Sequence, residues 1–321
     1  MANLNGTGRA QAVATGPLEI HPDERDEPKP VVTPSSRTFI PSQAPQPTDT
    51  SGAGPSQSEA PNGGDASYVY ALGRIDARFP SLAVEKEFAQ ATGRSETAGL
   101  TDRRVLQTLL AQRENRYLAR RLCWVLSIES LDTYILQPED PSDLEMLVES
   151  VRPSTSPGDI DVVIGVRGPV ASPAMCNGLM VPIVVASQVY SFDRAAFLKT
   201  IPKPDKMEAK QFGPAAHELF DRIIQLADNA GATDEHRALN YLAVRYPAIY
   251  AQATESFALN RSLTSVEVRP SRLSGTRRIV QVIFTYTDRQ TDVVDRYFCR
   301  VDVTEEFPFL FSKLAPFYDR W

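Results

Sequence analysis

Three segments near the C-terminus constrain the fold more than any other feature of the chain. Ser265–Arg269, Ile279–Thr287 and Val293–Thr304 are separated by turn residues and alternate between apolar and polar side chains. In the last segment every second residue from Tyr297 to Val303 is apolar. Because side chains alternate across a strand, each segment predicts a strand, and the short connections predict an antiparallel meander with one face on the core.

The rest of the ordered chain mixes helix and strand patterns. Helices are predicted after the cap Ser81, from Thr101, and from the cap Thr233 to the break at Pro247, and a capping box of Ser142 with Glu145 predicts a short one. A further helix is predicted around Leu219–Leu226. Strands are predicted at Tyr68–Ile75, Cys123–Ile128, Asp132–Leu136, Asp161–Val166 and Leu179–Val185. Pro182 lacks a backbone N–H, so the last of these strands is predicted at a sheet edge or at a bulge. The fold class is α+β.

The first fifth of the chain has the composition of a disordered tail. Ten of the 25 prolines lie within Met1–Pro61, and Phe39 is the only aromatic residue before Tyr68. Such a segment buries too little apolar surface to offset the entropy lost on ordering. We expect a disordered tail over 1–67 and a single domain over 68–321.

Charge and cysteine content exclude several classes of protein. The net charge of −6 provides no basic field for nucleic acid, and no apolar run approaches the length of a membrane span. The three cysteines are odd in number and widely spaced, which argues against a disulfide framework and favours a reducing, cytoplasmic location.

The sequence has no complete catalytic motif. It lacks a G-x-S-x-G elbow and a phosphate-binding glycine loop. Cys176 paired with His217 or His236 is a candidate nucleophile, and the same three residues are a candidate zinc site. The alternative is a packed thiol and two histidines that make ordinary hydrogen bonds, with no cofactor.

Arg167 and a separate cluster of arginines and tyrosines are candidate peptide-binding residues. Arg167, flanked by glycines at a strand end, could hold a carboxylate, or it could pair with a local acid in a tight turn. The second group surrounds the turn before the second meander strand, with tyrosines nearby in the same sheet: Arg269, Arg272, Arg277, Arg278, Tyr286 and Tyr297. A basic sheet edge of this kind can take an acidic extended peptide by strand addition, or it can protect the edge from aggregation.

Six segments, in one order, resemble the C-terminal domain of unknown function of cyanobactin maturation proteases of the PatG and PatA type. They are YVYALGRIDARFPSLAVEKEFAQATGR (Tyr68–Arg94), DTYILQP (Asp132–Pro138), DVVIGVRGP (Asp161–Pro169), MCNGLMVPIVV (Met175–Val185), LNYLAVRYPAIY (Leu239–Tyr250) and QTDVVDRYFCRVDVTEEFPFL (Gln290–Leu310). The resemblance implies a role in the biosynthesis of ribosomal peptide natural products. In that family the domain follows a subtilisin-like protease, whereas here a proline-rich tail precedes it.

Three functions remain open. The leading hypothesis is a non-catalytic accessory protein that binds the precursor (leader) peptide or the modifying enzymes of such a pathway. The second is an unrecognised, zinc-dependent peptide-modifying enzyme. The third is a scaffold that forms a homodimer and clusters enzymes.

Overall fold

The computed structural model describes residues 67–93, 99, 102–151, 159–193, 196–197, 213–214, 219, 221, 229–273 and 275–318. The chain divides into two units, Met1–Ala60 and Pro61–Trp321, and every described residue belongs to the second. The tail expected over 1–67 therefore lies outside the described residues, apart from Ser67. The helix expected around Leu219–Leu226 also lies largely outside them.

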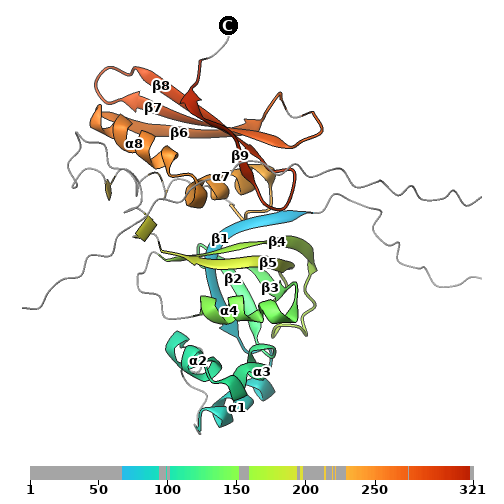
Figure 1. Ribbon diagram of the computed structural model, residues 1–321. Helices are drawn as coiled ribbons and strands as arrows, with labels where there is room; N and C mark the ends of the chain where they lie inside the picture. The colour runs from blue at the N-terminus through green and yellow to red at the C-terminus, as the bar shows by residue number, and fades with distance from the viewer. Residues whose placement is uncertain are drawn as a thin grey trace, which may run out of the picture. The chain divides into compact units, whose positions relative to one another are not determined.

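The first half of the described chain forms a closed five-stranded barrel (Figure 1). Its strands are β1 (Tyr68–Arg78), β2 (Cys123–Ile128), β3 (Leu131–Pro138), β4 (Ile160–Val170) and β5 (Pro182–Phe192). They close in the order β1-β2-β3-β5-β4, and β3 pairs with β5 in parallel while the other pairs are antiparallel. With helix α4 (Leu144–Ser150) between β3 and β4, this is the connectivity of an OB-type barrel.

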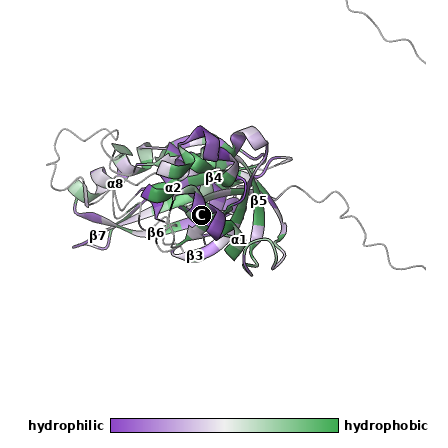
Figure 2. Cartoon of the chain, turned by 90° about the horizontal axis from the view of Figure 1, so that it is seen from below, coloured by the Kyte–Doolittle hydropathy of each residue, from purple (hydrophilic) through white to green (hydrophobic). Residues whose placement is uncertain are grey.

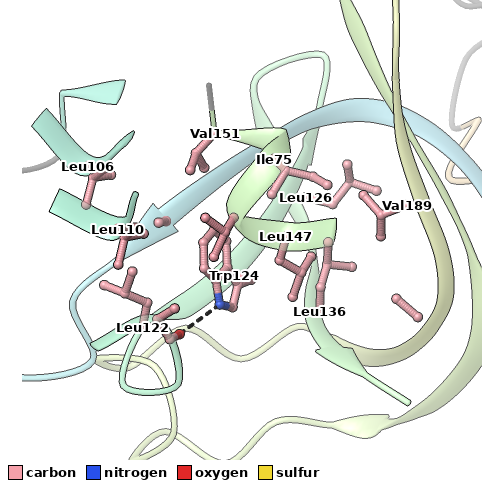
Figure 3. Packing of buried hydrophobic residues seen from close by; sticks show 14 of the residues in the cluster. Ile75, Leu106, Leu110, Leu122, Trp124, Leu126, Leu136, Leu147, Val151 and Val189 are labelled. Carbon is pink, nitrogen blue, oxygen red and sulfur yellow. Dashed lines mark hydrogen bonds between the residues drawn. The ribbon is translucent and has the colours of Figure 1, made fainter. Parts of the chain in front are cut away.

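The barrel interior is filled by apolar side chains from all five strands. Trp124 lies among Ile75, Leu126, Leu136 and Leu147, all buried (Figure 3). The connection from β1 to β2 adds a set of short helices: α1 (Leu82–Ala91), α2 (Arg103–Leu110), η1 (Arg113–Asn115) and α3 (Arg116–Ala119). The hydropathy colouring of Figure 2 shows both hydrophobic and hydrophilic stretches along the chain.

The second half forms a four-stranded antiparallel sheet in the order β6-β7-β8-β9. The strands are β6 (Arg261–Pro270), β7 (Ile279–Asp288), β8 (Val294–Asp302) and β9 (Phe309–Pro316). Helices α7 (Asp234–Arg245) and α8 (Ala248–Ala258) run along one face of this sheet (Figure 1). The core-facing side chains of β7 and β8 pack with both helices in one apolar cluster.

Helix α7 joins the barrel to the sheet. The amide of Asn240 donates a hydrogen bond to the backbone oxygen of Tyr70 in β1, at 2.8 Å. The ring of Tyr241 meets the ring of Tyr70 edge-on, with centroids 6.4 Å apart. The same apolar cluster contains residues of β1 and β4 as well as of the sheet, so the two layers share one core.

The α+β class and the C-terminal meander are confirmed. The face from Tyr297 to Val303 packs on the core as expected. A fourth strand, β9, extends the meander beyond the three predicted, and helix α8 begins directly after Pro247, where only a break was predicted.

Other boundaries differ from the sequence analysis for local reasons. The helix predicted from Thr101 is interrupted between α2 and α3. The predicted capping box is wrong, because the carboxylate of Asp140 rather than the hydroxyl of Ser142 accepts from the first turn, at 2.8 Å. Pro182 is the first residue of β5, which lies between β3 and β4 in the barrel rather than at an edge. The alternative prediction of a bulge agrees with the structure, because the register with β4 shifts next to Pro182, between Arg167 and Val170.

Cys123 and Cys176 form a disulfide, so the expectation of unpaired thiols is wrong for this pair. The two residues are 53 positions apart, and the connection from β4 to β5 folds back over the outer face of β2 to bring them together. Cys299 is a buried free thiol. No helix in the described part of the chain has the length and apolar character needed to cross a membrane.

Candidate functional site

Strand β6 lies at one edge of the four-stranded sheet and leads into the arginine-rich turn at 271–278. The backbone N–H of Ser271 donates to the oxygen of Ile279 in β7, at 2.7 Å. Because backbone groups alternate in direction along a strand, the N–H groups of Val266 and Val268 point away from β7, towards the open side. We call β6 and this turn the basic edge.

Two tyrosine hydroxyls occupy backbone donors of β9, the strand at the opposite edge of the sheet. The hydroxyl of Tyr241 accepts a hydrogen bond from the backbone N–H of Leu310, at 3.1 Å. The hydroxyl of Tyr246 accepts from the N–H of Leu314, at 2.9 Å. These two tyrosines satisfy donors that a further strand on β9 would need, so β6 is the edge better suited to strand addition.

The guanidinium groups of Arg269 and Arg277 each make local contacts and are partly exposed. Arg269 lies 3.4 Å from Glu267 and over the ring of Phe317, 5.3 Å from its centroid. Arg277 is 59% exposed and lies 3.5 Å from the buried carboxylate of Asp302. These contacts use only part of the five N–H donors of each guanidinium, so donors remain that can face solvent.

Arg278 is more firmly fixed than Arg277. Its side chain donates to the backbone oxygen of Thr304 at 3.0 Å, and its backbone N–H donates to the hydroxyl of the same residue at 2.9 Å. A second guanidinium nitrogen lies 3.8 Å from Asp234 on α7. Arg278 thus ties the turn to the end of β8, and its positive charge adds to the field at this end of the sheet.

The other two candidate binding residues lie elsewhere. Arg167 is exposed on β4 of the barrel, opposite Val184 of β5, and so does not belong to the basic edge. Tyr286 is 1% exposed and packs against Tyr297 in the core, and burial raises the pKa of its hydroxyl. The expectation that Tyr286 lines a binding surface is therefore corrected: the register of β7 turns its side chain inwards.

The residues proposed for catalysis or zinc are not brought together in the described part of the chain. Cys176 is disulfide-bonded, which removes the thiolate that a nucleophile or a zinc ligand requires. His236 lies in the first turn of α7, where its backbone N–H donates to the hydroxyl of Thr233. His217 lies outside the described residues. Among the residues that are described, no group of three or more His, Cys, Asp or Glu side chains could hold a metal ion.

The C-terminal part of the chain matches a family model. Residues 206–317 match the family model described as PatG C-terminal, a range that includes α7, α8 and the whole four-stranded sheet. The matched part of the chain is of the PatG C-terminal type. The basic edge lies within these matched residues.

A solved structure titled "PatG Domain of Unknown Function" has a similar fold. It is 21% identical, with a TM-score of 0.65, and the match covers 78% of this chain and 99% of that one. No curated protein matches the chain. The resemblance to the PatG domain read from the sequence is thus confirmed.

Sequence reasoning missed the tyrosines that cover β9. Tyr241 and Tyr246 lie five residues apart on and just after α7, a spacing that by itself indicates no shared role. Phe317 was also missed, although it packs edge-on against Phe298, with ring centroids 5.7 Å apart, and carries Arg269 on its face. These contacts depend on the order of strands, which the sequence pattern does not specify.

Proposed function

We propose that this chain is a non-catalytic accessory protein of ribosomal peptide natural product biosynthesis, and that it binds an acidic segment of a precursor peptide along strand β6. The observation that carries the proposal is that β6, beside the arginine-rich turn, pairs on one side only among the residues that the structure describes. The match to the PatG C-terminal family supports the pathway.

Strand addition suits the geometry of this edge. A bound peptide would receive backbone hydrogen bonds from Val266 and Val268 and place alternate side chains on opposite faces of the sheet. Arg269 and Arg277 lie towards one end of the strand, so acidic side chains near one end of the peptide would be favoured. Backbone bonds would supply affinity for any extended chain, and the arginines would select acidic ones.

The same edge also suits a strand or an extended loop of a modifying enzyme. An accessory protein that binds peptide and enzyme in turn would bring substrate to catalyst without chemistry of its own. We place such a protein with its pathway enzymes in the cytoplasm, and a homodimer of the chain would present two basic edges.

Isothermal calorimetry of the full chain with the precursor peptide encoded beside its gene tests this function. We expect binding that weakens about tenfold in an Arg269→Ala/Arg277→Ala variant, because each guanidinium contributes a charge-assisted hydrogen bond. Arg113→Ala is the matched control, since Arg113 is exposed on the barrel's β1–β2 connection, and it should leave affinity unchanged. Equal affinity of all three proteins, or no binding of the peptide, would reject the proposal.

A further inference from the structure

A pocket of about 450 Å³ opens on the barrel where β2 begins and β3 ends. Its walls come from the β1–β2 connection (79–122), the first residues of β2, the last residues of β3, the start of α4, and Met175 from the β4–β5 connection (171–181). In OB-type barrels the face of strands 2 and 3, between these same two connections, is where extended polymeric ligands bind. The position of the pocket therefore matches the binding face of the architecture.

The lining is mostly apolar. Leu144 and Met175 are partly exposed and contribute aliphatic and thioether surface, and prolines form part of the rim. Trp124 contributes little free ring surface, because it is 3% exposed and its indole N–H donates to the backbone oxygen of Ala119 at 3.1 Å (Figure 3). The volume falls within the usual range for ligand pockets and admits an apolar side chain together with its backbone.

Arg120 and Arg121 carry the only charges among the described residues that line this pocket. Both are exposed, and they are adjacent in the turn that leads into β2. Arg121 lies 3.6 Å from Glu87, a surface contact in which both side chains remain solvated. On a chain of net charge −6, an apolar pocket bordered by two guanidinium groups and no lining carboxylate is complementary to an anionic ligand with an apolar body.

The pocket is held in place on both sides. The disulfide between Cys123 and Cys176 fastens the β4–β5 connection beside Met175. On the other side, backbone bonds from Arg120 to Tyr117 and from Arg121 to Leu118, at 3.2 and 2.9 Å, form the turn that presents the two arginines. A fixed site of this kind costs little ordering on binding.

We propose that this pocket binds the C-terminal end of an apolar peptide, with the last side chain in the apolar cavity and the terminal carboxylate on Arg120 and Arg121. A peptide fits because the face suits extended chains. Nucleic acid fits poorly, since base stacking requires exposed aromatic rings and the lining provides none. The site uses no residue of the basic edge, so the proposal stands apart from the function proposed above.

Fluorescence anisotropy with a labelled apolar hexapeptide tests the pocket, using the full chain and two forms of the peptide that end in a free carboxylate or in an amide. We expect the carboxylate form to bind, and the amide form to bind at least tenfold more weakly. The Arg120→Ala/Arg121→Ala variant should lose the same factor for the carboxylate form only. Both arginines are exposed, so the variant should fold, and its thermal unfolding midpoint checks this.

Two controls separate this site from others. Arg113→Ala removes an exposed arginine of the same connection that does not line the pocket, and Arg269→Ala/Arg277→Ala removes the basic edge; both should leave anisotropy unchanged. Equal binding of the two peptide forms, no binding of either form, or tighter binding of an oligothymidylate of equal length would overturn the proposal. Loss of hexapeptide binding in the basic-edge variant would overturn it as well.

Discussion

The hydroxyl of Tyr246 accepts a hydrogen bond from the backbone N–H of Leu314 at 2.9 Å, on the side of β9 that faces away from β8. Tyr246, which lies just after helix α7, thereby satisfies a backbone N–H group on the β9 edge of the four-stranded sheet. The sheet is left with β6 as its more accessible edge, and the proposed function rests on this asymmetry.

Removing the Tyr246 hydroxyl should weaken the fold slightly. In Tyr246→Phe the part-buried N–H of Leu314 loses its acceptor, and we expect the free energy of unfolding to fall by about 0.5–1.5 kcal/mol. Urea denaturation measures the change. Tyr318→Phe is the control, because Tyr318 is 81% exposed, and it should change nothing beyond about 0.5 kcal/mol. Equal stabilities of the two variants would argue against the hydrogen bond between Tyr246 and the β9 edge.

Gly231 should not tolerate a side chain. Its φ is +71°, and a Cβ there would lie 2.4 Å from the backbone oxygen of Tyr70, whose own N–H donates to the oxygen of Gly231. We expect Gly231→Ala to lose about 2–5 kcal/mol of stability from left-handed strain and steric overlap together. Gly93→Ala has a similar φ of +65° but open space, so it should lose only about 1–2 kcal/mol. A smaller loss at Gly231 than at Gly93 would contradict the contact with β1.

Thiol counting tests the Cys123–Cys176 bond. Titration of the denatured, unreduced chain with a thiol reagent should find one thiol, that of Cys299, and prior reduction should raise the count to three. The Cys123→Ser/Cys176→Ser variant should lose about 2–4 kcal/mol of stability, because the bond closes a long loop in the unfolded chain. Three thiols before reduction would show that the two residues are not bonded.

Alkaline pH should destabilise the chain partly through Cys299. Burial raises the pKa of this thiol from 9.0 to about 12. The unfolded thiol ionises near its ordinary pKa while the folded thiol stays neutral, so its contribution is complete below pH 9 and is lost as pH rises towards 12. Between these values we expect stability to fall by about 2–4 kcal/mol more in the wild type than in Cys299→Ala. Parallel pH profiles of the two proteins would refute this.

Local patterns were enough to predict much of the fold. Strand β2 was predicted to its last residue, and the Thr233 cap correctly marked the start of α7, because strand propensity and capping depend on residues close in sequence. Helix α8 was missed because Pro247, taken as a break, also precedes a helix readily, since its fixed φ suits a first turn.

Long-range relationships could not be predicted in the same way. Apolar and β-branched residues predict that β3 and β5 are strands but not that they pair in parallel to close a barrel. Nor does spacing show that Cys123 meets Cys176 across 53 positions. The basic edge was partly predicted, since Arg269 and Arg277 are close in sequence, but the inward direction of Tyr286 depends on the register with β8.

Binding of alternately N-methylated peptides to the full chain tests strand addition at β6 most directly. Two versions of an acidic octapeptide from the precursor would carry N-methyl groups on its odd or on its even residues. An added strand directs alternate N–H groups towards its neighbour, so we expect one version to bind at least tenfold more weakly and the other to bind like the unmethylated peptide. Equal effects in both versions, or no binding of the unmethylated peptide, would contradict recognition along β6.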